Sequence, residues 1–250
     1  MRDLENKVAI VTGGGSGIGR ATALLFAEHG AKIVIADVDE EGANETVSQI
    51  KSAKGVAIFV KTDTSKPSDH KFLVEKTIEK YGDLHIACNN AGIGGPTVSV
   101  DEYPIEDWDK VIGTNLSGVF YGMRYQIPAM LKSGGGSIVN MSSILGIVAT
   151  KNLSAYVAAK HGVIGLTQTA ALENADKKIR INAVGPGYID TPLLSKTLDQ
   201  TTIDALASMH PIGRLGTSEE VAELVLWLSS SKSSFVTGSY YTIDGGYTAQ

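Results

Sequence analysis

The fold of this 250-residue chain follows from the stretch KVAIVTGGGSGIG, residues 7–19. Its first part, residues 7–11, is a short apolar run that ends at glycines, which is typical of a buried strand in a parallel sheet. From Ile18 to His29 the apolar residues recur with helical periodicity, and Gly30 is a typical helix stop. The stretch therefore predicts a strand, a glycine-rich turn and a helix in direct succession.

Gly13, Gly17 and Gly19 form the pattern G-x-x-x-G-x-G in that turn. Without side chains the backbone can turn tightly and approach a pyrophosphate, while the N-terminus of the following helix faces the negative charge. A glycine cluster alone also fits a plain tight turn. Its position between a strand and a helix favours a site for a phosphate-bearing cofactor.

Strands and helices alternate along the rest of the chain. Further strands are predicted at residues 32–36, 56–60, 84–88, 137–141, 179–184 and 239–243. Further helices are predicted at residues 40–53, 67–81, 105–131, 155–175 and 218–229. This alternation implies right-handed βαβ units. We therefore expect an α/β protein with a doubly wound, mainly parallel seven-stranded sheet, helices on both faces, and a single domain over residues 1–250.

Composition excludes several classes of protein. Hydrophobic residues make up 43% of the chain and charged residues 20%, which suits a soluble globular protein. No apolar run approaches the roughly 20 residues of a membrane helix, and the N-terminus lacks the apolar core of a secretory signal. With one cysteine, Cys88, and histidines without metal-ligand spacing, we expect no disulfide, no metal and a cytoplasmic location. The net charge of −5 argues against nucleic acid or a membrane as a partner.

Asp37 ends the second predicted strand, 18 residues after Gly19. A carboxylate there can accept hydrogen bonds from both hydroxyls of an adenosine ribose and would repel a 2′-phosphate. Val38, Gly14 and Gly15 offer no cationic side chain nearby. We therefore expect NAD(H) to be preferred over NADP(H). A solvated carboxylate at the end of a strand is the alternative.

Tyr156 and Lys160 are four residues apart and share one face of a predicted helix. A free tyrosine has a pKa of about 10. A positive charge roughly 5 Å away, at an effective dielectric of about 20, stabilises the phenolate by roughly 3 kcal/mol, or about two pKa units. We therefore expect Lys160 to lower the pKa of Tyr156 toward neutral pH, where general acid–base catalysis is most efficient.

The chain resembles the short-chain dehydrogenase/reductase family, in its form with a single Rossmann domain and a Tyr-x-x-x-Lys active site. The resemblance runs from Lys7 to Gly246 and rests on motifs that appear here in the family's order. These motifs are Thr12-Gly13-x-x-x-Gly17-Ile18-Gly19, Asn89-Asn90-Ala91-Gly92, Asn115, Ser143, Tyr156-x-x-x-Lys160, Pro186-Gly187 and Asp244-Gly245-Gly246.

The resemblance implies a role for each matching residue. Tyr156 would be the general acid for carbonyl reduction and the general base for alcohol oxidation, and Ser143 would bind the substrate oxygen. Lys160 would bind the nicotinamide ribose, and Asn115 would support a proton-relay water; a locally satisfied helix amide is the alternative for Asn115. The cofactor would be lined by Gly13, Ser16, Gly17, Ile18, Gly19, Asp37, Val38, Asp63, Thr64, Asn90, Ala91, Gly92, Pro186, Gly187, Ile189 and Thr191.

Residues of about 190–215 are expected to form a lid over the substrate. The expected substrate contacts are Ser143, Leu145, Leu153, Tyr156 and Tyr188. Because the residues around this pocket are mainly apolar, an apolar ketone or secondary alcohol is favoured over a charged sugar. Members of the resembling family are commonly homotetramers, and we expect the same here.

Three alternatives stay open at this point. A 3-oxoacyl carrier-protein reductase shares the motifs, but Asp37 argues against its usual NADP(H). A sugar or polyol dehydrogenase would also use NAD. A dinucleotide-sensing protein without catalysis is the alternative outside enzymes, although such proteins usually lose a catalytic residue. An enoyl reductase fits less well, because that group spaces its tyrosine and lysine more widely.

Overall fold

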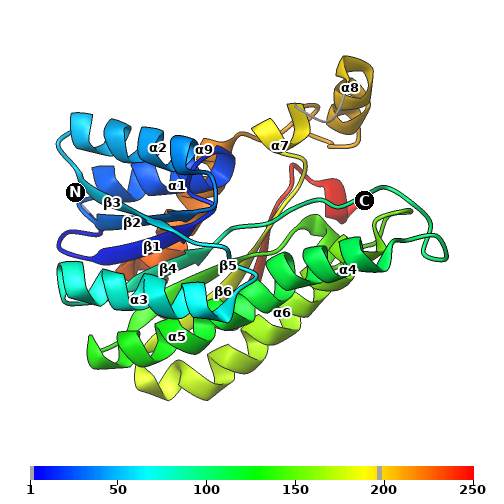
Figure 1. Ribbon diagram of the computed structural model, residues 1–250. Helices are drawn as coiled ribbons and strands as arrows, with labels where there is room; N and C mark the ends of the chain where they lie inside the picture. The colour runs from blue at the N-terminus through cyan, green and yellow to red at the C-terminus, as the bar shows by residue number, and fades with distance from the viewer. Residues whose placement is uncertain (1–2, 196–198) are drawn as a thin grey trace.

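A computed structural model describes residues 3–195 and 199–250. Within these ranges seven strands form one sheet in the order β3-β2-β1-β4-β5-β6-β7, and every neighbouring pair is parallel (Figure 1). The strands are β1 Val8–Thr12, β2 Lys32–Asp37, β3 Val56–Lys61, β4 Ile86–Asn89, β5 Gly136–Met141, β6 Ile179–Pro186 and β7 Tyr240–Ile243. The expected doubly wound α/β fold is confirmed.

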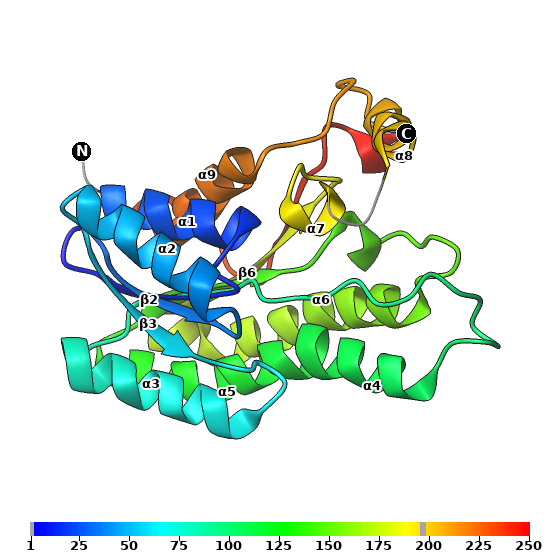
Figure 2. The same cartoon turned by 45° about the horizontal axis from the view of Figure 1, so that its top comes forward.

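Helices cover both faces of the sheet (Figure 2). One face carries α1 Gly17–Glu28, α2 Glu40–Ser52 and α9 Ser218–Ser229. The other carries α3 Pro67–Tyr81, α4 Ile105–Ile112, α5 Gly118–Lys132 and α6 Ser154–Asn174. An apolar core lies on each side, around Phe26 and Val225 on the first face and around Leu73, Met130 and Val163 on the second. Strands buried on both faces explain the continuous apolar runs in the sequence.

The strand order reverses between β1 and β4. From β1 the chain winds outward through β2 to β3 and then returns to the other side of β1 with β4. The loops after β1 and β4 therefore leave the sheet toward opposite faces, and a crevice for ligands forms at such a switch point. Short helices α7 Pro192–Ser195 and α8 Gln200–Ser208 stand beyond this edge (Figure 1).

The long helix expected over residues 105–131 is interrupted. A π-helical turn, Gly113–Ser117, separates α4 from α5. The segment that follows β6, which was expected to form a lid, contains the short helices α7 and α8. Residues 196–198 of the expected lid lie outside the described residues. No helix of the described ranges is long and apolar enough to cross a membrane.

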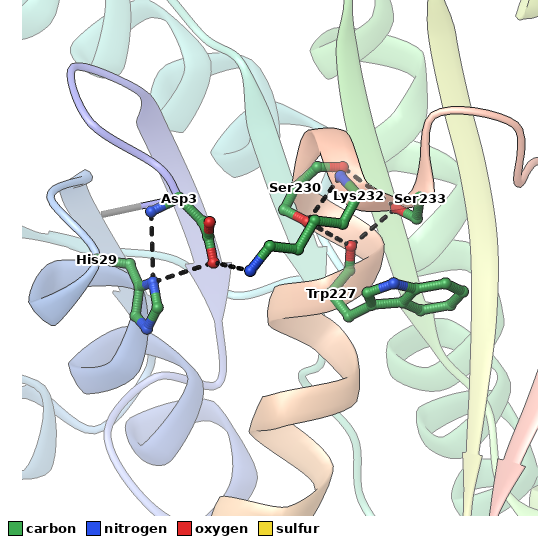
Figure 3. Close-up of polar contacts among 6 residues, drawn as sticks. All are labelled: Asp3, His29, Trp227, Ser230, Lys232 and Ser233. Atoms are coloured by element: carbon green, nitrogen blue, oxygen red, sulfur yellow. Dashed lines mark hydrogen bonds and ion pairs between the residues drawn. The ribbon is translucent and has the colours of Figure 1, made fainter. Parts of the chain in front are cut away.

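The amino-terminal segment is held by polar contacts to α1 and to the turn after α9 (Figure 3). Lys232 Nζ donates to Asp3 Oδ2 over 2.7 Å, and the backbone N–H of Asp3 donates to His29 Nδ1 over 3.4 Å. Ser230 and Ser233 both donate to the Trp227 carbonyl and so cap the end of α9. These contacts join the end of α1 to the turn after α9.

Candidate active site

The turn after β1 is a backbone cradle. Gly13 and Gly17 adopt φ angles of +64° and +50°, which residues with side chains rarely do. A Cβ atom at Gly13 would lie 2.9 Å from the Asn90 amide nitrogen, so the turn packs directly on the loop after β4. Ser16 precedes α1 and makes no side-chain cap. The first N–H groups of α1 therefore lack a side-chain partner from Ser16, and the cradle fits a phosphate.

Thr12 and Asn90 fasten the two central loops together. Thr12 Oγ1 accepts hydrogen bonds from the N–H groups of Asn90 and Ala91 at 2.9 and 3.1 Å. The Asn90 amide donates in return to the Thr12 carbonyl at 3.0 Å. Both loops of the switch point are thus held in one fixed arrangement. Ile18 lies partly buried at the start of α1, next to this junction.

Asp37 is held at the end of β2 by two backbone donors. Its Oδ2 accepts from the Gly15 N–H at 2.8 Å, and its Oδ1 accepts from the Asp39 N–H at 3.0 Å. A Cβ atom at Gly15 would lie 2.9 Å from that Oδ2, so only glycine allows this approach. Val38 beside it is exposed. The carboxylate is therefore fixed at the edge of the glycine cradle.

Arg20 is a basic residue near Asp37 that the sequence analysis missed. Its guanidinium donates to the carbonyl oxygens of Gly15 and Gly42, and its Nε donates to Thr46 Oγ1 at 3.0 Å. The guanidinium therefore lies beside Gly15, whose N–H binds Asp37, and the argument for NAD(H) from the sequence did not include it. Arg20 sits in the first turn of α1 on the side that faces α2, and this helical position was the available signal.

Asp63 and Thr64 lie just beyond β3, on the same edge of the sheet. Asp63 Oδ1 accepts from the Ser65 N–H at 3.1 Å and from its hydroxyl at 2.6 Å, and Lys66 Nζ lies 3.1 Å from Oδ2. These contacts, above all that with Ser65, hold the pKa of Asp63 below its usual range. Thr64 is buried, and its carbonyl lies 3.0 Å from His70 Nε2. Their expected contact with an adenine stays a prediction.

Lys160 brings a buried ammonium to the catalytic edge. Its side chain is 3% exposed, and its Nζ donates to the Met141 carbonyl at 2.8 Å. Burial lowers the pKa of Lys160 to about 8. Among the described residues, the Met141 carbonyl is the one hydrogen-bond acceptor of Lys160 Nζ. The ammonium therefore has donors left for a ligand.

Tyr156 and Ser143 lie beside Lys160. Lys160 Nζ is 5.4 Å from the centroid of the Tyr156 ring. Ser143 Oγ accepts from the Leu145 N–H at 3.2 Å, which leaves its own proton available. Neighbouring Ser142 donates to the Lys160 carbonyl at 2.9 Å and so ties the end of β5 to α6. The predicted serine, tyrosine and lysine thus meet at one place.

The pKa of Tyr156 differs from the expectation. Burial raises it above its ordinary value, the Ser143 hydroxyl lowers it and the neighbouring Tyr188 raises it further. The expectation that Lys160 lowers the pKa of Tyr156 toward neutral pH is therefore wrong. The physical reason is that removing water from around the phenol destabilises its anion more than the nearby groups stabilise it.

Asn115 lies in the π-helical turn, fully buried, and bonds to the loop after β4. Its Oδ1 accepts from the Ile93 N–H at 2.9 Å, and its Nδ2 donates to the Ile93 carbonyl at 2.8 Å. A Cβ atom at Gly92 would lie 3.3 Å from Asn115 Oδ1 and 3.7 Å from Lys160 Nζ. The Asn115 amide is therefore satisfied by a segment distant in sequence, and it holds Gly92 next to Lys160.

The segment after β6 crosses above the glycine cradle. The Thr191 methyl carbon would lie 3.4 Å from a Cβ atom at Gly17, so this residue covers the turn. Ile189 forms a parallel bridge with Gly216, and the Gly216 N–H donates to the Tyr188 carbonyl at 3.0 Å. The bridge joins the two ends of the expected lid. Pro186 is the last residue of β6, and Gly187 follows it.

Tyr188 belongs to an aromatic group at the substrate side, together with His210 and Tyr247. The ring of Tyr188 lies 5.8 Å from that of His210 and 5.9 Å from that of Tyr247. His210 Nε2 accepts from the Tyr188 N–H at 3.2 Å. The sequence analysis did not assign His210 and Tyr247 to the site. Of the other expected substrate contacts, Leu145 is almost fully buried and Leu153 partly exposed.

Known proteins resemble this chain over nearly its whole length. A family profile described as Enoyl-(Acyl carrier protein) reductase matches residues 13–248. The cyclohexanol dehydrogenase of Acinetobacter sp. (strain SE19) is 51% identical over 98% of this chain and 96% of its own length. The 3-oxoacyl-(acyl-carrier-protein) reductase FabG of Thermotoga maritima is 42% identical over 97% of this chain and 98% of its own. The crystal structure of levodione reductase matches with a TM-score of 0.96 and 35% identity, covering 98% of this chain and 99% of that one.

Proposed function

Because the chain belongs to the short-chain dehydrogenase/reductase family, an oxidoreductase family that uses nicotinamide dinucleotides and acts on alcohols or ketones, we propose that it oxidises an apolar alicyclic secondary alcohol with NAD⁺ and reduces the matching ketone with NADH. The observation that carries this proposal is the meeting of Ser143, Tyr156 and Lys160 beside the glycine cradle.

Each of the three side chains has one task in this proposal. Tyr156 gives its phenolic proton to the carbonyl oxygen during reduction and takes the alcohol proton during oxidation. Ser143 donates a hydrogen bond to the same oxygen, because its Oγ already accepts from Leu145 and its proton is free. Lys160 offers its remaining N–H donors to the ribose next to the nicotinamide. The nicotinamide, when bound, supplies or accepts the hydride.

The cofactor residues would act by position and charge. The cradle of Gly13, Gly17 and Gly19 would hold the pyrophosphate, and Ser16 and Ile18 would flank it. Asp63, Thr64 and Val38 would surround the adenosine. The amide-linked loop with Asn90, Ala91 and Gly92 would line the dinucleotide. Pro186, Gly187, Ile189 and Thr191 would close over the nicotinamide end.

Preference for NAD(H) rests on Asp37. Its carboxylate is pre-oriented by two backbone N–H groups and would accept hydrogen bonds from the ribose hydroxyls. A 2′-phosphate at the same place would meet a fixed negative charge. Arg20 weakens this repulsion, but its guanidinium is occupied by two carbonyls and a hydroxyl.

A ring-shaped substrate is supported by two relatives, and its apolar character by the pocket side chains. The relatives are named cyclohexanol dehydrogenase and cis-4-hydroxycyclohexanecarboxylate dehydrogenase, at 51% and 43% identity. Leu145, Leu153 and Tyr188 would contact the ring. The FabG relative at 42% identity supports the second candidate, a 3-oxoacyl carrier-protein reductase.

The test follows nicotinamide absorbance with purified protein and either cofactor. Cyclohexanol, a linear secondary alcohol, a polyol and a short 3-oxoacyl thioester are compared at equal concentration. The proposal expects the highest kcat/KM with cyclohexanol and NAD⁺. Faster turnover of the 3-oxoacyl thioester with NADPH would favour the second candidate. Tight NADH binding with no turnover of any compound would favour a dinucleotide sensor.

The remaining proposals concern the whole chain. We propose a single domain over residues 1–250 with a lid at about 190–215, a cytoplasmic location, and a homotetramer. Exposed apolar side chains on α5 and α6, among them Phe120 and Leu172, support an assembly. Size-exclusion chromatography with light scattering at several protein concentrations tests the subunit number.

A further inference from the structure

A phenol from the last strand contacts the loop that carries Ser143. Tyr240 Oη donates a hydrogen bond of 2.7 Å to the Ser143 carbonyl oxygen, although the two residues are 97 positions apart. Tyr240 begins β7, and Ser143 follows β5. The Tyr240 side chain therefore crosses the intervening strand β6 and joins the edge strand of the sheet to the catalytic loop.

The register of the sheet and one glycine make this reach feasible. Tyr240 stands opposite Ala183 of β6, and Thr242 stands opposite Gly185. Side chains of alternate residues point to the same face of a sheet, so Ala183, Gly185 and Tyr240 share one face. A Cβ atom at Gly185 would overlap the Tyr240 phenol. The absent side chain at position 185 is the space that the phenol occupies.

The loop at Ser143 is shaped locally but anchored from two sides. The Gly146 N–H donates to the Ser143 carbonyl at 2.8 Å, and the Leu145 N–H donates to Ser143 Oγ, so these bonds close one 3-10 turn on itself. Ser142, the residue before Ser143, donates a hydrogen bond from its hydroxyl to the Lys160 carbonyl on α6. The Tyr240 bond reaches the Ser143 backbone from β7.

The Tyr240 phenol stays a donor throughout the neutral range. Burial, followed by the nearby Asp244 carboxylate, raises its pKa to about 12. Deprotonation would leave two acceptors facing each other at the Ser143 carbonyl. The bond therefore persists at any pH at which the proposed chemistry of Tyr156 runs.

We propose that Tyr240 is a positioning residue that fixes the Ser143 loop against Tyr156, and that the absence of a side chain at Gly185 makes room for it. This inference rests on the proposed function, in which the Ser143 hydroxyl must face both Tyr156 and the substrate oxygen. When the Tyr240 hydroxyl is removed, the Ser143 carbonyl keeps its bond within the turn but loses its anchor to the sheet.

The first test is Tyr240→Phe in the nicotinamide assay. We expect kcat to fall about tenfold, the value of one modest hydrogen bond, while KM for the dinucleotide stays within a factor of two. The kinetic pKa for alcohol oxidation should rise, because a looser Ser143 lowers the pKa of Tyr156 less. The matched control is Tyr241→Phe, since Tyr241 packs on Trp227 with ring centroids 5.7 Å apart and makes no contact with Ser143.

The second test does not depend on activity. Hydrogen exchange in peptides that cover residues 143–148 should be faster in Tyr240→Phe than in the wild type and unchanged in Tyr241→Phe. This measurement decides the anchoring claim even if the wild type turns over none of the compounds tested, an outcome that would overturn only the proposed function.

A double-mutant cycle tests the role of Gly185. Gly185→Ala should lower kcat at least as far as Tyr240→Phe does, because the methyl group expels the phenol. In a Tyr240→Ala background, Gly185→Ala should lower kcat by less than a factor of two. Equal losses in both backgrounds, or a Tyr240→Phe enzyme with the wild-type kcat, kinetic pKa and exchange rates, would overturn the inference.

Discussion

At the scale of single residues, the proposed acid–base chemistry depends on one phenol whose pKa is raised by burial. Such a phenol carries its proton at neutral pH but gives it up less readily, and oxidation requires other groups to stabilise its anion. The Ser143 hydroxyl stabilises this anion, because its hydrogen bond lowers the pKa of Tyr156. The ammonium of Lys160, 5.4 Å from the ring centroid, is the nearby positive charge.

Replacing Tyr156 by phenylalanine removes the proposed acid and leaves the cradle for the cofactor intact. We expect Tyr156→Phe to bind NADH within about threefold of the wild type and to lose at least about 100-fold in kcat, as is usual for loss of a general acid. Fluorescence titration and steady-state rates measure the two effects. Tyr81→Phe is the control, because the Tyr81 hydroxyl is buried without a partner. A Tyr156→Phe enzyme with more than a tenth of the wild-type rate would contradict the mechanism.

Removing the carboxylate of Asp37 should change the choice of cofactor. A unit charge about 5 Å from a phosphate, at an effective dielectric of about 20, corresponds to roughly 3 kcal/mol, or about a 100-fold ratio. We expect Asp37→Ser to reduce the NADH preference in kcat/KM by about that factor. Asp39→Ser removes a charge two residues away and keeps a capping side chain for α2. We therefore expect this variant still to prefer NADH over NADPH. Unchanged discrimination in Asp37→Ser would refute the assignment.

At the scale of elements, the interruption between α4 and α5 positions a residue that a regular helix would place elsewhere. In the π-helical turn Asn115 bonds to both backbone groups of Ile93 and so fixes the loop that begins at Asn90. Turns of this kind often occur at functional sites. The amide thereby links a helix on one face of the sheet to the proposed cofactor loop.

Loss of this link should weaken cofactor binding. Asn115→Ala removes both hydrogen bonds to the partly buried backbone of Ile93, each worth about 0.5–1.5 kcal/mol. Because the loop from Asn90 to Gly92 would line the dinucleotide, we expect Kd for NADH to rise about tenfold or more, measured by calorimetry. Asn44→Ala removes an exposed amide from α2, whose partner is the Glu40 carbonyl, and should leave Kd unchanged. Equal Kd values for the two variants would show that the link does not shape the cofactor site.

At the scale of the whole molecule, the elements that are buried on both faces were predictable and the contacts between distant strands were not. Apolar runs bounded by glycines identify the strands, because only such residues suit a sheet covered on both sides. The position of Asn115 in a π-helical turn, the contact of Arg20 with Gly15 and the reach of Tyr240 to Ser143 depend on tertiary packing. Periodicity in the sequence carries no signal for contacts of that kind.

The buried ammonium of Lys160 makes the stability of the whole molecule depend on pH. Its pKa is about 8 in the folded chain, against an ordinary value of 10.5. Below about pH 8 both the folded and the unfolded chain carry the proton, and the cost of burying the charge is fully present. Between about pH 8 and 10.5 the unfolded chain binds more protons than the folded one, so the free energy of unfolding rises with pH.

We therefore expect the wild type to gain about 3 kcal/mol of unfolding free energy relative to Lys160→Met over that window, and about 2 kcal/mol of it by pH 9.5. Methionine keeps a long side chain in the same space and cannot titrate. Urea unfolding of the cofactor-free proteins, at one protein concentration and at steps from pH 7 to 9.5, measures the difference, and the other titrating groups cancel because both proteins contain them. Lys151→Met, at an exposed position, should show the same dependence of the unfolding free energy on pH as the wild type. If Lys160→Met showed the same pH dependence as the wild type, Lys160 would titrate like an ordinary lysine. Its ammonium would then be solvated and not buried with donors left for a ligand.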